Sequence, residues 1–409
     1  MQKNIVILGA GFGGLQAALT LSKKLKKRGL WEKYSVVLID KNPFHTFTPL
    51  LYEIAATSPE TASNLNLQDL VSFPIQSLVA YRHVEFRNDC VEGIDWENRK
   101  VRLSRSELDF EYLVTALGAE VNYFDIPGLK EHGLPLKTFA DALKIRDTIV
   151  EIFRNAKRNV RIVVGGGGST GVELASEIKG WVPELTRECG AKCETEITIV
   201  ESHTRILFHL DERVADKAER RLARIGVAIV AGAKISRIDG KAVYFTNGEK
   251  REFDILIWTG GVKANVATGQ LEVAQDTETA MAAGVFAVGD GATLINPATK
   301  RPVPGMARPA MMEGRVAAEN IFRKILEAEN LAAESDGPVY RHREYPYIIP
   351  VGNKYAAAKI GPFVVAGLPA WIFKGITELN YFLSIMPPIQ AIKIWFRGFL
   401  IFVKNDRLG

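Results

Sequence analysis

The chain has 409 residues, 47% of them hydrophobic, and its 52 Lys and Arg residues nearly balance 47 Asp and Glu residues. This length suits two or three domains that each bury a core. A net charge of +5 does not indicate a nucleic-acid-binding protein, although a local basic patch would still favour an anionic membrane. The three cysteines, Cys90, Cys189 and Cys193, are too few for a disulfide scaffold and fit a reducing compartment.

No segment has the pattern of a secretory signal or of a spanning helix. The apolar run at 5–8 is shorter than the roughly 7–15 apolar residues of a signal peptide. The two longest uncharged stretches, 360–373 and 379–392, contain proline and fall short of the roughly 18 residues that cross a bilayer. We therefore expect a protein that is made and kept in the cytoplasm.

The order strand, glycine loop, helix, strand opens the chain. A buried strand is predicted at 4–8, followed by a glycine loop at 9–14 and a helix to about Arg28. The next strand, 35–39, ends at Asp40. Strands that alternate with helices in this way are typical of parallel βαβ units.

The same order returns in the middle of the chain. A strand is predicted at 161–164, then a glycine loop at 166–171, a helix through Ile178, and a strand at 197–200 that ends at Glu201. The chain therefore contains two candidate dinucleotide-binding units rather than one.

Weaker signals between and after these units complete the predicted fold. Further strands are expected at 84–96, 100–103, 112–117, 227–245, 254–258 and 284–288, a helix at about 310–328, and a polar linker at 330–338. We predict an α/β fold with two Rossmann-like dinucleotide-binding domains, the second inserted in the first, and a C-terminal helical membrane-anchoring region. The expected boundaries are 1–118 and 261–329 for the first domain, 119–260 for the second, and 339–409 for the C-terminal region.

The first glycine loop has the fingerprint of a dinucleotide site. Its glycines allow a tight turn, bare backbone against a pyrophosphate and close helix–strand packing, while the helix N-terminus favours phosphate. The carboxylate of Asp40 can accept hydrogen bonds from both hydroxyls of a ribose. The alternative is a glycine-rich surface turn, which the strand before the loop, the helix after it and the acid argue against. The residues expected to contact this dinucleotide are Gly9, Gly11, Gly13, Gly14, Asp40 and Lys41.

The second glycine loop repeats the fingerprint in Gly166, Gly168 and Gly171. Glu201 occupies the position equivalent to Asp40. A carboxylate there repels a 2′-phosphate, so we expect NADH to be preferred over NADPH. His203 and Arg205 follow closely, and we expect them to be solvated loop residues.

Two fingerprints in one chain predict a flavoprotein, which takes hydride from NADH and passes electrons onward, because a simple dehydrogenase needs only one dinucleotide. A later strand ends in Gly289 and Asp290, where a carboxylate can hydrogen-bond the ribityl chain of FAD. Gly260 closes another strand and is expected near the second nucleotide. Glu173 lies in the first turn of the helix after the second loop, and is either a charge favoured by the helix dipole or a group where the nicotinamide meets the flavin. No metal site is expected.

The C-terminal segment 368–404 is rich in aromatic and aliphatic residues. On a helical wheel, Lys393, Arg397 and Lys404 fall within about 40° of one another, and the rest of the circumference is largely apolar. This pattern suits a helix that lies in a membrane interface, with a second, less regular helix at 370–385. The alternative is a helical hairpin that buries its apolar face in a homodimer interface or against the body of the protein.

Four motifs and the aromatic C-terminal region suggest a family. The motifs lie at 5–14, at 48–53 (Thr-Pro-Leu-Leu-Tyr-Glu), at 166–175 (ending in Gly-Val-Glu-Leu-Ala) and at 287–290. With them, nearly the whole chain resembles the type II NADH:quinone oxidoreductases, single-subunit flavoproteins on the inner face of energy-conserving membranes. The resemblance implies FAD in the first domain, NADH in the second, and a membrane quinone that reaches the flavin beside the membrane helices. It also makes Glu173 a candidate on the nicotinamide–quinone side of the flavin.

One departure concerns the helix start that faces flavin and quinone in this family, which usually carries an Ala-Gln pair and a second Gln. By position, Arg308 and Met312 stand where the glutamines would be. Arg308 can donate a hydrogen bond to a quinone carbonyl, whereas Met312 cannot. The electron acceptor therefore stays open, and two alternatives remain: a sulfide:quinone oxidoreductase, which needs cysteines beside the flavin, and a nucleotide-binding redox sensor without turnover.

Overall fold

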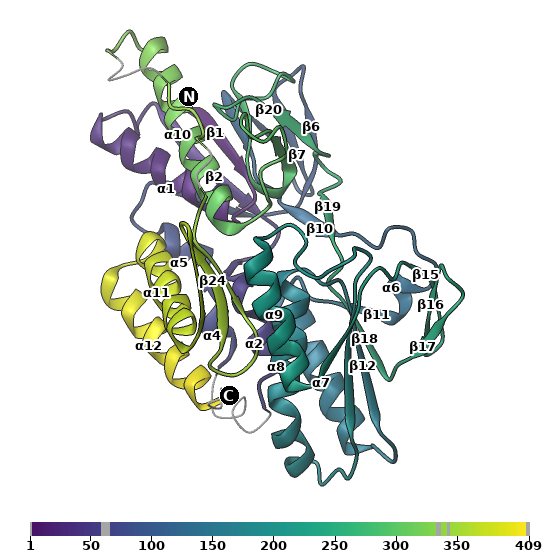
Figure 1. Ribbon diagram of the computed structural model, residues 1–409. Helices are drawn as coiled ribbons and strands as arrows, with labels where there is room; N and C mark the ends of the chain where they lie inside the picture. The colour runs from purple at the N-terminus through teal and green to yellow at the C-terminus, as the bar shows by residue number, and fades with distance from the viewer. Residues whose placement is uncertain (1, 59–65, 333–336, 342–343, 406–409) are drawn as a thin grey trace. The chain divides into compact units, whose positions relative to one another are not determined.

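The computed structural model describes residues 2–58, 66–332, 337–341 and 344–405, and the chain divides into two compact units (Figure 1). Unit 1 comprises Met1–His45, Phe73–Glu120 and Val262–Glu344. Unit 2 comprises Thr46–Ser72, Val121–Gly261 and Tyr345–Gly409. Residues 333–336 of the predicted linker and the side chain of Lys404 lie outside the described part.

Unit 1 is built on a parallel sheet. Its strands, in order across the sheet, are β21 (Val285–Ala287), β9 (Tyr112–Thr115), β1 (Lys3–Leu8), β2 (Tyr34–Asp40) and β5 (Val84–Asn88). The strands are apolar because both faces are covered. The helices of this unit are α1 (Phe12–Lys27), α5 (Ile75–Val79) and α10 (Ala307–Ala328), and α1 packs against α10.

An antiparallel sheet covers one face of the parallel sheet in unit 1. It consists of β6 (Val91–Asp95), β7 (Lys100–Leu103) and β8 (Glu107–Asp109). Val6 and Leu8 of β1 share a buried core with Val101 and Leu103 of β7, because alternate side chains of a strand point to the same face. The remaining short elements are β20 (Leu271–Val273), η2 (Gly289–Gly291) and β22 (Ala292–Leu294).

Unit 2 repeats this plan. Its parallel sheet has the order β11 (Gly133–Pro135), β18 (Ile255–Trp258), β12 (Val160–Gly165), β13 (Thr195–Val200) and β14 (Val227–Val230). The helices α7 (Phe139–Arg154), α8 (Ser169–Glu188) and α9 (Glu212–Ile225) pack on this sheet, and α6 (Leu129–His132) precedes it. An antiparallel sheet of β15 (Ile235–Asp239), β16 (Ala242–Phe245) and β17 (Lys250–Glu252) packs on the core of this unit.

The end of the chain adds a small sheet and two helices to unit 2. The antiparallel strands are β23 (Tyr347–Pro350), β24 (Ala356–Ile360) and β25 (Phe363–Gly367), followed by α11 (Leu368–Ile385) and α12 (Pro388–Asn405). Unit 2 also contains η1 (Thr48–Leu50), α2 (Leu51–Ala55) and α4 (Gln68–Val71). Short strand pairs, β3 (Phe44–Thr46) with β4 (Ser72–Pro74) and β10 (Ala119–Val121) with β19 (Val262–Ala264), lie where the chain passes between the units.

The prediction of an α/β fold with two parallel Rossmann-like sheets is confirmed, and three details differ. The segment 46–72, predicted in the first domain, belongs to unit 2, because the buried side chains of α2 pack on α7 and α8. The helix predicted to end at Ile178 continues to Glu188, past Pro183, because Leu185 is fully buried. The C-terminal region, predicted as helices, begins with a three-stranded sheet whose hairpin turn uses Gly361 at φ +58°.

None of the helices in the described ranges combines the length and the apolar character that crossing a bilayer requires.

Candidate cofactor and active-site residues

The first glycine loop, residues 9–14, has an open surface at the N-terminus of α1. Gly9 has φ +97°, and a Cβ on it would lie 2.2 Å from the carbonyl oxygen of Ala116. A Cβ on Gly14 would lie 1.9 Å from the carbonyl oxygen of Gly9, whereas a Cβ on Gly11 would meet nothing within 4 Å. The outer glycines are therefore required for close packing, and the middle one leaves space for a ligand against bare backbone.

Asp40 lies beside this loop at the end of β2. Its Oδ2 accepts a hydrogen bond of 2.8 Å from the backbone N–H of Ala10, and its Oδ1 accepts one of 2.8 Å from that of Asn42. Burial raises the pKa of Asp40. Lys41, predicted to contact the cofactor, is exposed. Since no side chain caps the N-terminus of α1, the open loop and the adjacent carboxylate fit a dinucleotide's pyrophosphate and ribose.

The second glycine loop, residues 166–171, has the same geometry. Gly166 has φ +105°, a Cβ on Gly171 would lie 2.0 Å from the carbonyl oxygen of Gly166, and a Cβ on Gly168 would meet nothing within 4 Å. Gly260 packs against this loop, since a Cβ on Gly166 would come within 2.5 Å of its Cα. The second loop therefore also fits a dinucleotide.

Glu201, at the end of β13, is held beside the second loop as Asp40 is held beside the first. Its Oε2 accepts a 2.7 Å hydrogen bond from the N–H of Gly167, and its Oε1 accepts from the backbone N–H and ring Nδ1 of His203 at 2.8 and 2.7 Å. Burial raises the pKa of Glu201, but these hydrogen bonds outweigh burial and lower it. The carboxylate is thus a fixed negative charge at neutral pH.

His203 and Arg205 lie in a loop as expected, with His203 exposed and Arg205 half-buried, but both also have specific partners. Besides its bond to Glu201, the His203 ring stacks on Phe208 with 3.5 Å between centroids. Arg205 forms an ion pair with Asp216 at 2.7 Å. Both side chains are therefore fixed by contacts within unit 2.

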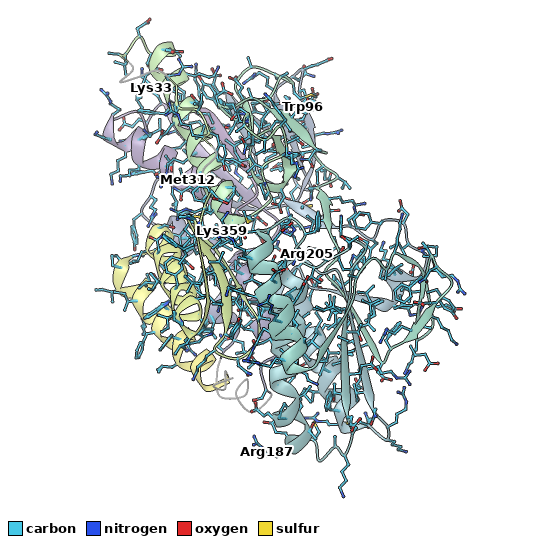
Figure 2. All side chains as sticks on the ribbon, in the orientation of Figure 1. Lys33, Trp96, Arg187, Arg205, Met312 and Lys359 are labelled. Atoms are coloured by element: carbon cyan, nitrogen blue, oxygen red, sulfur yellow. The ribbon has the colours of Figure 1, made fainter. Side chains whose placement is uncertain are left out.

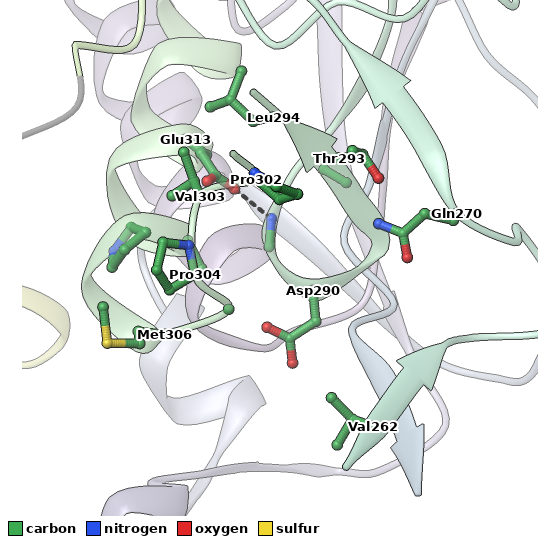
Figure 3. Close-up of a pocket in the computed structure, with 15 residues that line it drawn as sticks. Val262, Gln270, Asp290, Thr293, Leu294, Pro302, Val303, Pro304, Met306 and Glu313 are labelled. Atoms are coloured by element: carbon green, nitrogen blue, oxygen red, sulfur yellow. Dashed lines mark hydrogen bonds between the residues drawn. The ribbon is translucent and has the colours of Figure 1, made fainter. Parts of the chain in front are cut away.

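A pocket of about 340 Å³ in unit 1 lies at the carboxyl end of β21 (Figure 3). It is lined by η2, by the loop before α10 and by the first turns of α10, and the Asp290 side chain lines it. Sequence analysis missed Glu313, whose Oε2 accepts a 2.6 Å hydrogen bond from the N–H of Gly289. Burial, followed by the nearby Asp290 charge, raises the pKa of Glu313 to about 7. The sequence offered one indication of Glu313: it lies near the start of the helix predicted after the strand that ends in Gly289 and Asp290.

Two further predicted residues lie on α10. Arg308 is exposed in the first turn. Met312, labelled in Figure 2, is half-buried and packs against an apolar cluster that contains Leu294, Val316 and Tyr340. The thioether therefore has a packing role in unit 1. Gly13, predicted to contact the first dinucleotide, packs against later segments of unit 1, because a Cβ on it would come within 2.9 Å of the Val288 side chain.

Unit 2 contains a buried group that sequence analysis missed, which we call the acid–lysine cluster: Glu53, Lys374 and Glu378. The ammonium of Lys374 forms ion pairs with Glu53 Oε1 and, at 3.0 Å, with Glu378 Oε1. The Tyr52 hydroxyl donates a 2.8 Å hydrogen bond to Glu53 Oε1, whereas the buried Glu53 Oε2 has no hydrogen-bond partner among the described residues. The side chains are 6% to 13% exposed, so their charges are poorly screened.

Glu173, on α8, is electrostatically linked to this cluster. Burial raises its pKa to about 8, Lys374 opposes the rise and Glu53 adds to it. Burial also raises the pKa of Glu378. Burial alone would lower the pKa of Lys374, but the carboxylates of Glu378 and Glu53 outweigh it and raise that pKa. A pKa of about 8 keeps Glu173 mostly protonated at neutral pH.

The three cysteines lie at peripheral positions of their units. Cys90 is exposed between β5 and β6, and Cys189 and Cys193 are half-buried at and after the end of α8. None of them lines the pocket at Asp290.

The sequence profile of the family described as pyridine nucleotide-disulphide oxidoreductase matches residues 3–314. The chain belongs to this family. Within it, the chain is 29% identical over 349 residues to the type II NADH:quinone oxidoreductase of Staphylococcus aureus, covering 80% of this chain and 84% of that protein. This likeness confirms the resemblance predicted from the motifs.

Two solved structures share the fold. NDH2 from Plasmodium falciparum in complex with NADH matches with a TM-score of 0.76 and 17% identity, over 99% of this chain and 98% of that chain. The sulfide:quinone oxidoreductase of Aquifex aeolicus matches with a TM-score of 0.73 and 21% identity, over 93% and 90%. At these identities the likeness concerns the fold, and the chemistry has to be argued from residues.

Proposed function

We propose that the protein is an FAD-dependent NADH:quinone oxidoreductase. The observation that carries this proposal is the pair of open glycine loops, each with a buried acid hydrogen-bonded beside it. The net reaction is NADH plus one proton plus quinone, giving NAD⁺ and quinol, so one proton comes from the medium. Steady-state NADH oxidation by the FAD-loaded protein with a soluble quinone tests it, and purified protein without flavin would contradict it.

The roles of the two units follow from their residues. In unit 1, the first glycine loop and Asp40 bind the adenosine and pyrophosphate of FAD, and Asp290, held through Gly289 by Glu313, binds the ribityl chain. In unit 2, the second glycine loop and Glu201 bind NADH. When bound, the flavin accepts hydride and delivers electrons singly or in pairs, while the protein supplies alignment and electrostatics.

The sulfide:quinone alternative finds no support in the cysteines. That chemistry needs thiols beside the flavin, and none of the three cysteines lines the Asp290 pocket. A non-enzymatic sensor would be distinguished by kinetics, because it would consume one equivalent of NADH and then stop.

We propose that Glu173 supplies the proton for quinone reduction, with the acid–lysine cluster as its electrostatic partner. A carboxyl whose pKa is about 8 is mostly protonated at neutral pH and can donate. Ionisation of Glu173 would return a negative charge next to Lys374, whose ammonium stabilises it. Burial therefore favours the protonated form of Glu173 and Lys374 stabilises the ionised form, so that Glu173 can both give up a proton and take one up again during turnover.

Replacing Glu173 by glutamine is expected to lower kcat with quinone roughly a hundredfold, because the amide cannot give up a proton. In the unchanged protein, kcat should fall about tenfold per pH unit above a pH of about 8, as the donor ionises. The variant should lose this alkaline limb. Glu184→Gln, farther along α8, serves as the matched control, and an unchanged pH profile in Glu173→Gln would contradict the role.

Glu201 should set the preference for NADH. We expect Glu201→Gln to raise kcat/KM for NADPH about tenfold, because removal of the fixed charge relieves its repulsion of the 2′-phosphate. The amide keeps an oxygen for the N–H of Gly167, so kcat/KM for NADH should fall only severalfold. Initial rates with both nucleotides measure the ratio, and an unchanged ratio would show that another group controls it.

We propose that α11 and α12 hold the protein on the cytoplasmic face of the cell membrane, as a peripheral protein. Up to residue 400, where its side chains are described, the exposed apolar side chains of α12 lie on one stripe about 100° wide, and α11 adds a second exposed apolar row. They are Ile389, Ile392, Phe396, Phe399 and Leu400 on α12, and Ile372, Ile376 and Leu383 on α11. The exposed Lys393 flanks the first stripe and suits anionic headgroups.

The double substitution Ile392→Ser and Phe396→Ser should weaken binding to lipid vesicles more than tenfold, because both side chains are about half exposed and would insert. Thermal unfolding should not change. Lys393→Gln should weaken binding about fivefold to anionic vesicles only. Flotation of the purified protein with vesicles measures this, and equal flotation of the double variant would remove the stripe from the membrane contact.

A further inference from the structure

Both backbone polar groups of Ala10, the residue between the first two glycines of the first loop, are held by hydrogen bonds. The N–H of Ala10 donates to Asp40 Oδ2 at 2.8 Å, and its carbonyl oxygen lies 2.7 Å from His45 Nδ1. Ala10 is 2% exposed and His45 is 1% exposed, so neither contact is exchanged easily for water. His45 follows β2 in the chain and belongs to the same unit as the loop.

The state of the His45 ring follows from this partner. A carbonyl oxygen only accepts, so Nδ1 carries the hydrogen. Burial lowers the pKa of His45 to about 4, although the bond to Ala10 opposes this, and the ring is neutral at physiological pH. The ring of Phe12 meets it edge-on with 5.3 Å between centroids, which helps to fix the plane of the imidazole.

The second glycine loop has the same arrangement with a different donor. The N–H of Gly167 donates to Glu201 Oε2 at 2.7 Å, and its carbonyl oxygen accepts a 2.8 Å hydrogen bond from the backbone N–H of Leu207. Two loops far apart in the sequence thus fix the peptide groups on both sides of the equivalent residue. The carbonyl group of each of these residues lies in the same planar peptide group as the N–H of the open middle glycine that follows, so fixing the carbonyl orients that N–H.

We propose that His45 is a positioning residue for FAD, which donates through Nδ1–H to Ala10 and keeps the first glycine loop in the shape that accepts the pyrophosphate. This inference rests on the proposed function, since it takes FAD as the ligand of unit 1. The imidazole of His45 donates the hydrogen bond that the backbone N–H of Leu207 donates in the second loop. Loss of the imidazole should therefore weaken FAD binding and leave NADH binding unchanged.

The test compares His45→Asn with His45→Gln, and both with His45→Ala. The amide nitrogen of asparagine takes the place of Nδ1, whereas that of glutamine reaches the place of Nε2, so only asparagine restores the bond. Flavin fluorescence released on dilution of the FAD-loaded full-length protein gives the dissociation constant. We expect His45→Ala and His45→Gln to weaken FAD binding roughly tenfold to a hundredfold, and His45→Asn to stay within about threefold of the unchanged protein.

Binding of NADH, measured calorimetrically on each variant, reports whether unit 2 stays folded and should not change. If His45→Ala does not fold, the comparison between asparagine and glutamine still decides. Equal FAD affinity of His45→Asn and His45→Gln, or unchanged affinity of His45→Ala, would overturn the role of His45. Failure of the unchanged protein to bind FAD would instead reject the proposed function.

Discussion

Replacing Gly11 by valine is expected to abolish FAD binding and reduce NADH oxidation to background, a loss of more than about a thousandfold, because the flavin carries the chemistry. A Cβ at Gly11 would meet no described atom within 4 Å beyond its own chain neighbours, so the new side chain would occupy the space that the proposed pyrophosphate needs. Gly11 also has φ −71°, which valine adopts without strain. The substitution should therefore remove the cofactor while leaving the fold.

Gly168→Val is the matched control, because Gly168 has the equivalent open position and a φ of −70° in the second loop. That variant should keep FAD, as its absorbance spectrum would show, and lose NADH binding. The absorbance of purified protein and calorimetric titration with NADH measure both ligands. A Gly11→Val protein that retains flavin at full occupancy would mean that FAD does not lie on the first loop.

Replacing Lys374 by methionine is expected to lower the free energy of unfolding by about 3–5 kcal/mol. Methionine fills much of the same volume but leaves Glu53 and Glu378 buried without the ammonium that both contact. The pKa of Glu378, which burial already raises, would then rise further, because the ammonium that opposes the rise is gone. Urea unfolding of the full-length protein, at neutral pH, measures the loss.

A double variant separates lost charge pairing from lost packing. Lys374→Met with Glu53→Gln should recover at least about 1 kcal/mol relative to Lys374→Met alone, because one uncompensated carboxylate has been removed. Lys393→Met, at an exposed lysine on α12, should stay within about 0.5 kcal/mol of the unchanged protein. A Lys374→Met protein of unchanged stability would show that the ion pairs of the cluster contribute nothing net.

Features set by local sequence were predictable. Gly9 and Gly166 need positive φ, and Asp40 and Glu201 end the strands that follow their loops, so spacing along the chain alone indicates two dinucleotide sites. Alternation of strand and helix then indicates parallel sheets. These inferences need contacts only within one βαβ unit, which is why they agree with the structure.

Features that join distant segments were not predictable in the same way. Glu53 and Lys374 are 321 residues apart, and nothing in either local pattern indicates that they meet. The sequence around His45 does not indicate that its ring contacts the carbonyl oxygen of Ala10. In the start of α10, sequence analysis considered Arg308 and Met312 and did not identify Glu313 as a functional residue. Each of these groups is a buried polar side chain whose partner is chosen by the tertiary fold.

The central claim is that electrons pass from NADH through FAD to a quinone, and anaerobic sequential mixing tests it most directly. FAD-loaded protein is mixed first with one equivalent of NADH and then with a soluble quinone, while flavin absorbance is followed. We predict loss of the oxidised flavin spectrum in the first step and its full return in the second. A flavin that NADH does not bleach, or that bleaches and does not return with quinone, would contradict the account.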